Sequence, residues 1–426
     1  MTATSGHRIL VRAGKDPLTP LSHEQSLSIR HDGVFGTNAG NMLFYTAAWR
    51  TLLTDDADLV ADGYSTERDR PQRVADRIDG EFDRVVIPLA NAFRTSFLPQ
   101  LDRLTEVIRR LKVPVSVLGV GAQFGLSAGV ETASPELRES VRAFVSAVLD
   151  RSPSIGVRGE FTQAFLSDLG FRGDQVEVIG CPSLYGFGGI AGTEGRGGIA
   201  PRSGLHPNSA VAVTYSPYLR DIGLFVDEVT RAYPNSYVVP QTVEGLALML
   251  HGRPTRYADK SLLPESPEHE LYRSDRMRFF VDATTWIDSL RDRDLVIGTR
   301  IHGTIAGLLA GAPSILIAHD SRTRELAEFH AIPHRTKAAL RRVNVEKWYR
   351  AADFDAFTAR HAVNLANFRA FLGRHRLEHT LDDESTRFDR ELTAVRLAPP
   401  VRVARGGARP SRIHRVLSRA RAALGR

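Results

Sequence analysis

The sequence predicts an α/β fold with two Rossmann-like, parallel-sheet domains that face a cleft. Three observations lead to this prediction. The chain has 426 residues, the length of two ordinary domains. Short apolar runs alternate with stretches of helical spacing, as in a parallel sheet covered by helices on both faces. A glycine-rich segment, 186–204, separates two such series and holds eight glycines in nineteen positions.

The first series predicts an N-terminal α/β domain over residues 31–190. It follows a polar segment, 1–30, which we expect to be a loose lead-in. The apolar runs are short enough to be buried strands, and the stretches between them have helical periodicity. The predicted strands are 84–90, 113–121, 154–158 and 176–180, and the predicted helices are 99–111, 136–150 and 160–169.

The second series predicts a C-terminal α/β domain over residues 205–345, with 186–204 as the linker. C-terminal helices are expected over 346–400, with 346–371 as one helix. Because ligands of such sheets bind at the carboxyl ends of the strands, we expect the site in the cleft. The predicted strands are 211–216, 236–241, 278–282, 294–300 and 314–320, and the predicted helices are 220–232, 283–292, 303–310 and 323–330.

The composition is that of a globular protein, with 42% hydrophobic residues. The single cysteine, Cys181, excludes a disulfide framework and a cysteine-based zinc site. No apolar run approaches the roughly 18 to 20 residues that span a bilayer. The first residues lack the apolar segment of a signal peptide. We therefore expect a cytoplasmic protein.

The positive charge is concentrated in an arginine-rich tail, 401–426. This segment holds eight arginines, and the rest of the chain has 48 basic against 49 acidic residues. The body is thus neutral, and we expect no nucleic-acid partner. Residues 411–426 show a short basic amphipathic pattern, which predicts weak contact with an anionic membrane at its inner face. A solvated tail, or an arm that binds a protein partner, is the alternative.

The segment 294–320 is the most informative for chemistry. A buried strand leads to Arg300, and His302 and Gly303 then open a helix of small residues. A helix start suits a phosphate, and the arginine fork suits a phosphate or a carboxylate. A histidine can exchange a proton near neutral pH. The structural alternative is a strand–turn–helix with a surface arginine and a capping histidine.

Two further segments place candidate residues near the expected cleft. Arg158 follows the strand 154–158, where an arginine can bind an anion or form a structural ion pair. Asn38, Gly40 and Asn41 form a tight turn before a helix. Such a loop can approach a ligand closely, or its asparagines can simply cap the helix.

Several common chemistries are excluded by missing motifs. The chain has no Walker phosphate loop, no nucleophile elbow, no dinucleotide fingerprint and no histidine pair of metalloprotease spacing. The acidic residues of 55–58 are interpreted as a solvated helix end. We expect neither a metal nor a cofactor.

Taken together, these motifs resemble the polysaccharide pyruvyl transferase family over roughly residues 31–335. The order and spacing of the motifs carry the resemblance, since none of them is decisive alone. The motifs are Asn38-Ala39-Gly40-Asn41, then Ser154-Ile155-Gly156-Val157-Arg158, and finally Arg300-Ile301-His302 with Gly311-Ala312-Pro313 and Asp320.

The resemblance implies a GT-B-like fold and the transfer of a pyruvyl group from phosphoenolpyruvate to a saccharide or lipid-linked saccharide. By hypothesis, Arg158 and Arg300 then clamp the anionic groups of the donor, and His302 is the general acid or the group that shuttles protons. The other implied substrate-binding residues are Asn38, Gly40, Asn41, Gly303 and Asp320. Asp32 and Asp320 are the candidates for the base that deprotonates the sugar.

Two departures from the family pattern leave other readings open. Asn41 stands where the family commonly has aspartate, and Ser321-Arg322-Thr323-Arg324 follows Asp320, where the family often has a lysine. One alternative is a sugar-nucleotide glycosyltransferase, with Glu325 or Glu328 placed for the ribose. Another is a non-catalytic carbohydrate-binding relative.

Overall fold

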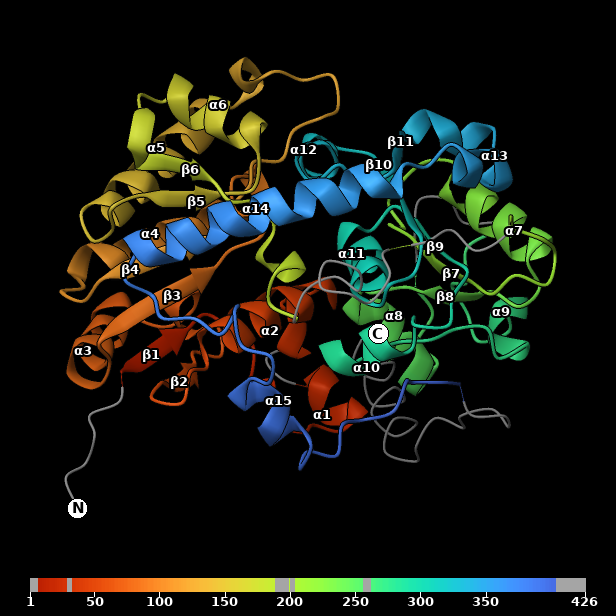
Figure 1. Ribbon diagram of the computed structural model, residues 1–426, viewed down its shortest axis with the longest axis horizontal. Helices are drawn as coiled ribbons and strands as arrows, with labels where there is room; N and C mark the ends of the chain where they lie inside the picture. Colours follow the sequence, from red (N-terminus) through yellow and green to blue (C-terminus); the bar gives the residue numbers. More distant parts are fainter. Residues whose placement is uncertain (1–6, 29–32, 188–198, 200–203, 256–261, 404–426) are drawn as a thin grey trace, which may run out of the picture.

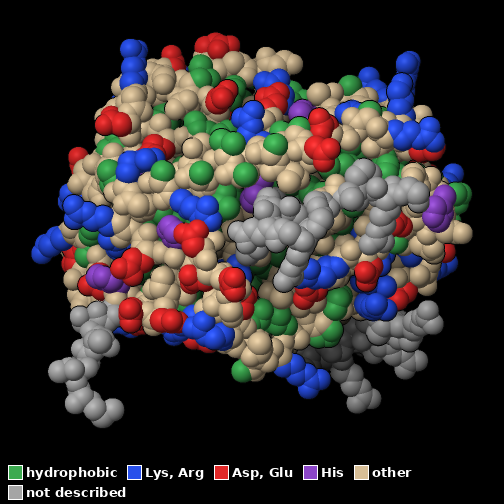
Figure 2. All heavy atoms as spheres, viewed as in Figure 1, with side chains coloured by type: hydrophobic (Ala, Val, Ile, Leu, Met, Phe, Trp, Pro, Cys, Tyr) green, Lys and Arg blue, Asp and Glu red, His purple; other side chains and the backbone are tan. Residues whose placement is uncertain are grey.

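The computed structural model describes residues 7–28, 33–187, 199, 204–255 and 262–403. Two parallel sheets, each covered by helices, lie side by side (Figure 1). On the face shown in Figure 2, basic and acidic side chains are interspersed over the described residues. Among these residues no helix is long and apolar enough to cross a membrane.

The first half contains a four-stranded sheet in the order β2-β1-β3-β4, with the pair β5-β6 beside it. A parallel bridge from Val120 to Val157 connects β4 to this pair. The strands are β1 (Arg8–Val11), β2 (Asp58–Ala61), β3 (Arg84–Pro88), β4 (Val115–Leu118), β5 (Ile155–Val157) and β6 (Val176–Val178). The helices are α1 (His23–Ser28), α2 (Gly40–Leu52), α3 (Pro71–Glu81), α4 (Leu98–Arg110), α5 (Pro135–Leu149) and α6 (Glu160–Asp168).

The expectation of a loose lead-in is wrong for residues 8–11. They form β1, which lies between β2 and β3 in parallel register. Ile9, Leu10 and Val11 are buried there. Four residues in a polar context give too short a pattern for periodicity, so the strand is recognisable only from its neighbours in the sheet.

The second half contains a five-stranded parallel sheet in the order β11-β10-β9-β7-β8. The strands are β7 (Val211–Thr214), β8 (Tyr237–Val239), β9 (Leu295–Gly298), β10 (Ser314–Ala318) and β11 (His334–Thr336). The helices are α7 (Ile222–Ala232), α8 (Val243–His251), α9 (Glu270–Arg273), α10 (Ala283–Asp288), α11 (Ile301–Leu309) and α12 (Ser321–Phe329).

The two halves share one strand order, which confirms the predicted pair of parallel-sheet folds. In each half the first strand has the second strand on one side and the third on the other. The direction in which successive strands are added to the sheet therefore reverses between β1 and β3, and again between β7 and β9. Ligands of open α/β sheets bind outside the carboxyl ends of the strands at such switch points.

The predicted strand at 278–282 is not a strand. Met277 forms an isolated bridge to Val238, and Phe279 forms one to Val401. This run is apolar because a connecting segment buries Phe279 and Phe280 in the core. Most of the predicted linker 186–204, and residues 404–426 of the tail, lie outside the described residues.

The predicted helix 346–371 is divided into α13 (Val345–Arg350) and α14 (Phe354–Arg374). Asp353 interrupts it and caps α14, because its carboxylate accepts a hydrogen bond from the Ala356 N–H at 2.9 Å. Helix α14 runs from the second half back across the first (Figure 1). At its end His375 is hydrogen-bonded to Ser116 and Ser154 of the first half.

The halves are also joined through a common core. Helix α2 is buried on every side, and one apolar cluster continues from it into the second sheet. Phe35 and Phe279 meet within this cluster with ring centroids 5.8 Å apart. Helix α15 (Arg387–Leu392) is joined to α2 by an ion pair between Asp389 and Arg50.

Candidate active site

The switch points of both sheets open on one cavity of about 630 Å³. Arg12 follows β1 and Asn91 lies just after β3, while Ser216 and Arg300 lie just after β7 and β9. All four line the cavity. The cavity is therefore formed by the carboxyl ends of both sheets, as predicted from the strand pattern.

Positive charge dominates the lining of this cavity. Five arginines reach it, against the carboxylates of Glu67 and Glu244. Glu67 is already neutralised by Arg12, whose Nε donates a hydrogen bond to it at 2.7 Å and whose Nη2 forms an ion pair with it at 2.6 Å. The surplus suits an anionic ligand. The five arginines are Arg12, Arg68, Arg94, Arg300 and Arg322.

Arg300 is positioned by the end of strand β9. Its Nε donates a hydrogen bond to the carbonyl oxygen of Tyr215, 3.1 Å away, which ties the side chain to the end of the neighbouring strand. Gly298 allows β9 to approach β7 closely at this point, because a Cβ on Gly298 would lie 1.8 Å from the backbone oxygen of Thr214. The predicted residue thus lines the cavity from a backbone-anchored position.

His302 lies beside Arg300 in the first turn of α11. It lines the cavity but is only 7% exposed. Its ring packs on the start of α2, where a Cβ on Gly40 would lie 2.7 Å from Nδ1. Burial lowers the pKa of His302 to about 3, and the positive charges of Arg158 and Arg322 act in the same direction. The imidazole is therefore neutral at pH 7 in the unliganded protein.

Arg158 does not line the cavity, contrary to its predicted position at the cleft. The side chain is fully buried, and its Nε and Nη2 donate to the Gly119 carbonyl at 3.3 and 3.1 Å. Its Nη1 has no hydrogen-bond partner within the described part of the chain. Burial lowers the pKa of Arg158 to about 10, so Arg158 remains a cation, and its charge acts on His302.

Asn38 and Asn41 do line the cavity, and their hydrogen bonds explain why asparagine suits both positions. Asn38 accepts a hydrogen bond from the Gly40 N–H at 2.8 Å and so holds the start of α2. Asn41 donates from Nδ2 to the carbonyl oxygens of Phe35 and Gly36, at 2.7 and 3.2 Å. An ionised aspartate at position 41 could not donate these bonds.

Three other predicted residues, Gly40, Gly303 and Asp320, do not line the cavity. Gly303 is buried and packed against Thr214, where a Cβ would lie 2.5 Å from a methyl group. Asp320 caps α12 by accepting from the backbone N–H of Thr323 at 2.8 Å. Although burial alone would raise it, Arg322 and His319 lower the pKa of Asp320 to about 2, which makes it a poor base. Asp32 lies outside the described residues.

A sequence model of the polysaccharide pyruvyl transferase family matches residues 38–321, two thirds of the chain. The chain belongs to this family. It is accordingly a transferase, and the match includes the Asn38 loop, Arg158, Arg300 and His302. No curated protein matches the chain.

Solved structures resemble this pyruvyl transferase family member at low sequence identity. UDP-N-acetylglucosamine 2-epimerase from Rickettsia bellii is 12% identical, with a TM-score of 0.44 over 87% of this chain and 96% of its own. The Neisseria meningitidis epimerase bound to UDP-GlcNAc is 8% identical, with a TM-score of 0.41 over 85% and 100%. The S. aureus MnaA–UDP structure is 11% identical, with a TM-score of 0.41 over 87% and 94%.

Several charged or titratable residues that line the cavity of this transferase were not predicted as site residues from the sequence, among them Arg12, Arg94, His319 and Arg322. Arg12 was missed together with strand β1. Arg94 and His319 each follow the end of a strand, and that position was the signal that could have found them. Arg322 was noted only as a replacement for lysine. It pairs with Asp320 at 3.2 Å, and so extends from the first turn of α12 into the cavity.

The lining is held together by a chain of hydrogen bonds between the two halves. Asn91 donates to Gln123 at 2.6 Å, and Gln123 donates to Asp320 at 3.1 Å. Nearby, the Ser321 N–H donates to the carbonyl oxygen of Phe124 at 3.0 Å. Groups of three or more side chains suited to hold a metal ion are absent among the described residues.

Proposed function

We propose that this protein transfers a pyruvyl group from phosphoenolpyruvate to two hydroxyls of a saccharide, forming a cyclic pyruvate ketal. The family supports pyruvyl transfer to a saccharide. The observation that carries the proposal is that Arg300 and a buried, neutral His302 line the same cavity, in which positive charge is in surplus.

The donor carries a phosphate and a carboxylate, and the cavity offers cations for both. Arg94 and Arg322 line it, and the Nε of each is buried without a hydrogen-bond partner in the described residues. Burial and the charge of Arg322 lower the pKa of Arg94. An anion between the two guanidinium groups would relieve their repulsion and satisfy the buried N–H groups. Arg300 would hold the second anionic group.

The reaction requires a proton on the methylene carbon of phosphoenolpyruvate and an attack by a sugar hydroxyl on the adjacent carbon. A second hydroxyl of the sugar then displaces phosphate and closes the ketal. We assign the first proton to His302. Burial is the main cause of the low pKa of His302, and nearby arginines add to it; the anionic donor would offset the effect of the arginines and so favour the protonated ring. The arginines act by positioning and by electrostatic stabilisation.

For the base that deprotonates the sugar we propose His319. It lines the cavity, and its Nε2 lies 3.6 Å from Asp320 Oδ2. Burial lowers the pKa of His319 to about 4, which leaves the ring neutral, and the adjacent carboxylate of Asp320 would stabilise the imidazolium formed when the ring takes a proton. This assignment replaces Asp320, whose Oδ1 is occupied by the helix cap and whose Oδ2 accepts from Gln123 and Arg322.

Neither acidic residue suggested for a nucleotide ribose lines the cavity. Glu325 is buried and accepts hydrogen bonds from the N–H and hydroxyl of Thr162, at 2.9 and 2.8 Å. Glu328 is exposed and pairs with Arg324. These two residues therefore give no support to a sugar nucleotide as the donor. Asn41, the basis of the non-catalytic reading, is accounted for by its backbone hydrogen bonds.

The acceptor is proposed to be a saccharide, and a lipid-linked saccharide would suit the arginine-rich tail. A cytoplasmic protein whose tail contacts the inner face of the membrane weakly would meet such an acceptor there. Sedimentation with anionic vesicles at low salt, comparing the full chain with a 1–400 truncation, tests this contact. Equal partitioning of the two forms would exclude it.

The transfer itself is tested with purified protein, phosphoenolpyruvate and a panel of soluble and lipid-linked saccharides. We expect phosphate release that depends on the acceptor, with one ketal formed for each phosphate released. Transfer of a sugar from a nucleotide sugar to the same acceptors, without ketal formation, would replace this function by the glycosyltransferase alternative.

A further inference from the structure

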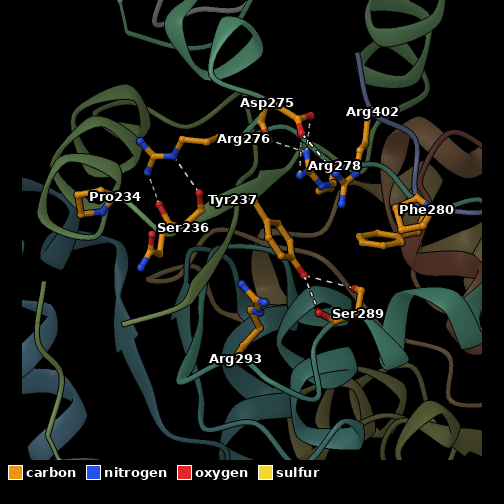
Figure 3. A pocket seen from close by; sticks show the side chains of 12 residues that line it. Pro234, Ser236, Tyr237, Asp275, Arg276, Arg278, Phe280, Ser289, Arg293 and Arg402 are labelled. Atoms are coloured by element: carbon orange, nitrogen blue, oxygen red, sulfur yellow. Dashed lines mark hydrogen bonds and ion pairs between the residues drawn. The ribbon is translucent and has the colours of Figure 1, made fainter. Parts of the chain in front are cut away.

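A second cavity, of about 410 Å³, opens on the C-terminal half at the amino ends of β8 and β9 (Figure 3). Ser236 directly precedes β8, and Arg293 lies just before β9. The active-site cavity is at the carboxyl ends of the same strands. The two cavities therefore lie at opposite ends of one sheet and have no lining residue in common.

Four arginines line this second cavity, with Asp275 as the single acidic side chain among the described lining residues. Arg276 is a structural cation, because it donates to the carbonyl oxygens of Thr230, Tyr233 and Ser236. Arg278 and Arg402 share Asp275, at 3.0 and 3.4 Å. The local charge is thus well above zero. The four are Arg276, Arg278, Arg293 and Arg402.

Arg293 has no acidic partner within the described part of the chain. Its guanidinium lies over the ring of Tyr237, 5.3 Å from the centroid, and its Nε is buried without a hydrogen-bond partner there. In the view of Figure 3, Arg293 lies on one side of the Tyr237 ring, and Arg278 and Arg402 lie on the other. Burial lowers the pKa of Arg278, and the nearby Arg402 acts in the same direction.

We propose that this cavity binds the phosphate group of an organic phosphate. Forked guanidinium groups match phosphate oxygens, and a dianion would neutralise the surplus charge of Arg293, Arg278 and Arg402. The volume is larger than phosphate alone requires and is typical of small-molecule sites. Tyr237 and Phe280 supply an apolar wall for the organic part. This proposal does not depend on the pyruvyl transfer reaction.

The phosphate could belong to a soluble compound or to a lipid headgroup. The position of the cavity suits a lipid headgroup, because Arg402 lines the cavity and the arginine-rich sequence 404–426 follows it in the chain. The backbone of Val401 is fixed beside the cavity by its bridge to Phe279. Both sources present the same phosphate chemistry to the arginines.

The test follows the modification of individual arginines by phenylglyoxal in the full chain, read by peptide mass spectrometry. The probes are inorganic pyrophosphate, and phosphatidylcholine vesicles with and without phosphatidic acid. At ten times the dissociation constant, we expect modification of Arg293 and Arg402 to slow about tenfold. Arg291, which is exposed and paired with Asp288, should be unaffected and serves as the internal control.

Protection by pyrophosphate alone supports a soluble phosphate compound, and protection by phosphatidic acid vesicles supports a lipid headgroup. In Arg293→Gln the protection of Arg402 should be lost, whereas Arg291→Gln, with the same loss of charge, should retain it. Equal modification of Arg293 with and without both probes would overturn the proposal. So would protection of Arg402 that persists unchanged in Arg293→Gln.

Discussion

Arg300 keeps its guanidinium at the cavity through its hydrogen bond to the Tyr215 carbonyl. Lysine at this position would retain the charge but could not bind an anion through a planar fork. We expect Arg300→Lys to lower kcat/KM for phosphoenolpyruvate by at least ~100-fold, with little change in stability. Arg335→Lys, a change of the same kind at β11, is the control. Near-normal turnover in both Arg300→Lys and Arg300→Ala would remove Arg300 from the mechanism.

His302 is predicted to act in proton transfer and not in donor binding. The unliganded ring is neutral, so it contributes no charge to the first encounter with the donor. His302→Ala should bind phosphoenolpyruvate with similar affinity and turn over ~100-fold or more slowly. Titration calorimetry and steady-state kinetics separate the two effects. Lost binding with normal turnover at saturation would make His302 a phosphate ligand instead.

Asn41 is predicted to be structural. In Asn41→Asp the carbonyl oxygens of Phe35 and Gly36 would face a carboxylate, and we expect the free energy of unfolding to fall by ~1–3 kcal/mol at pH 7. Urea denaturation measures this change. Asn235→Asp removes a similar bond, to the Asn208 carbonyl, at an exposed position and should cost much less. An Asp variant as stable as the wild type and more active would show that position 41 prefers a carboxylate.

These residues also show how far sequence reasoning extends. Arg300 and His302 could be placed because strand, turn and helix follow each other directly in the chain. The burial of Arg158 could not, because its depth depends on how Gly119 and Gly121 pack around it. The side chain fits there because a Cβ on Gly121 would lie 2.2 Å from Arg158 Cδ.

At the level of elements, the strands predicted best are those buried on both faces. Such strands appear as continuous apolar runs, as β9 and β10 do. β1, β2 and β11 were missed, because the first two are single short apolar stretches in polar surroundings and β11 is polar. The apolar run at 278–282 was wrongly predicted to be a strand, since burial in a connecting segment gives the same pattern as a strand.

Helix α14 contains a buried histidine whose role is open to a direct test. His361 packs against Tyr185 with ring centroids 5.7 Å apart, and neither ring nitrogen has a hydrogen-bond partner in the described residues. Burial lowers the pKa of His361 to about 4. The unfolded chain, with a pKa near 6.5, therefore binds a proton that the folded protein excludes, and stability is lost as the pH falls from about 6.5 to 4.

His361→Phe removes this proton uptake and retains the ring. We expect the slope of unfolding free energy against pH to fall by up to ~1.4 kcal/mol per pH unit between pH 6.5 and 4. The stability at pH 7 should be kept or increased. The control is His375→Phe, which breaks hydrogen bonds to Ser116 and Ser154 and should destabilise the protein at pH 7. An unchanged pH slope in His361→Phe would contradict the account of α14.

For the whole molecule, the common strand order of the two halves has a functional consequence. It brings two switch points to one cavity, so that cations from both sheets can surround a single anion. The continuous core and the return of α14 hold the halves in this arrangement. The chemistry of the cavity therefore depends on the packing of the halves and not on one motif.

Donor binding tests the central claim most directly, because it requires no knowledge of the acceptor. Thermal unfolding is measured with phosphoenolpyruvate, pyruvate, phosphate and UDP-GlcNAc, for the wild type and for Arg300→Lys. Phosphoenolpyruvate at one hundred times its dissociation constant should stabilise the wild type by about 2.7 kcal/mol, and the variant much less. Stabilisation by UDP-GlcNAc, with no response to phosphoenolpyruvate, would contradict pyruvyl transfer as the function of this protein.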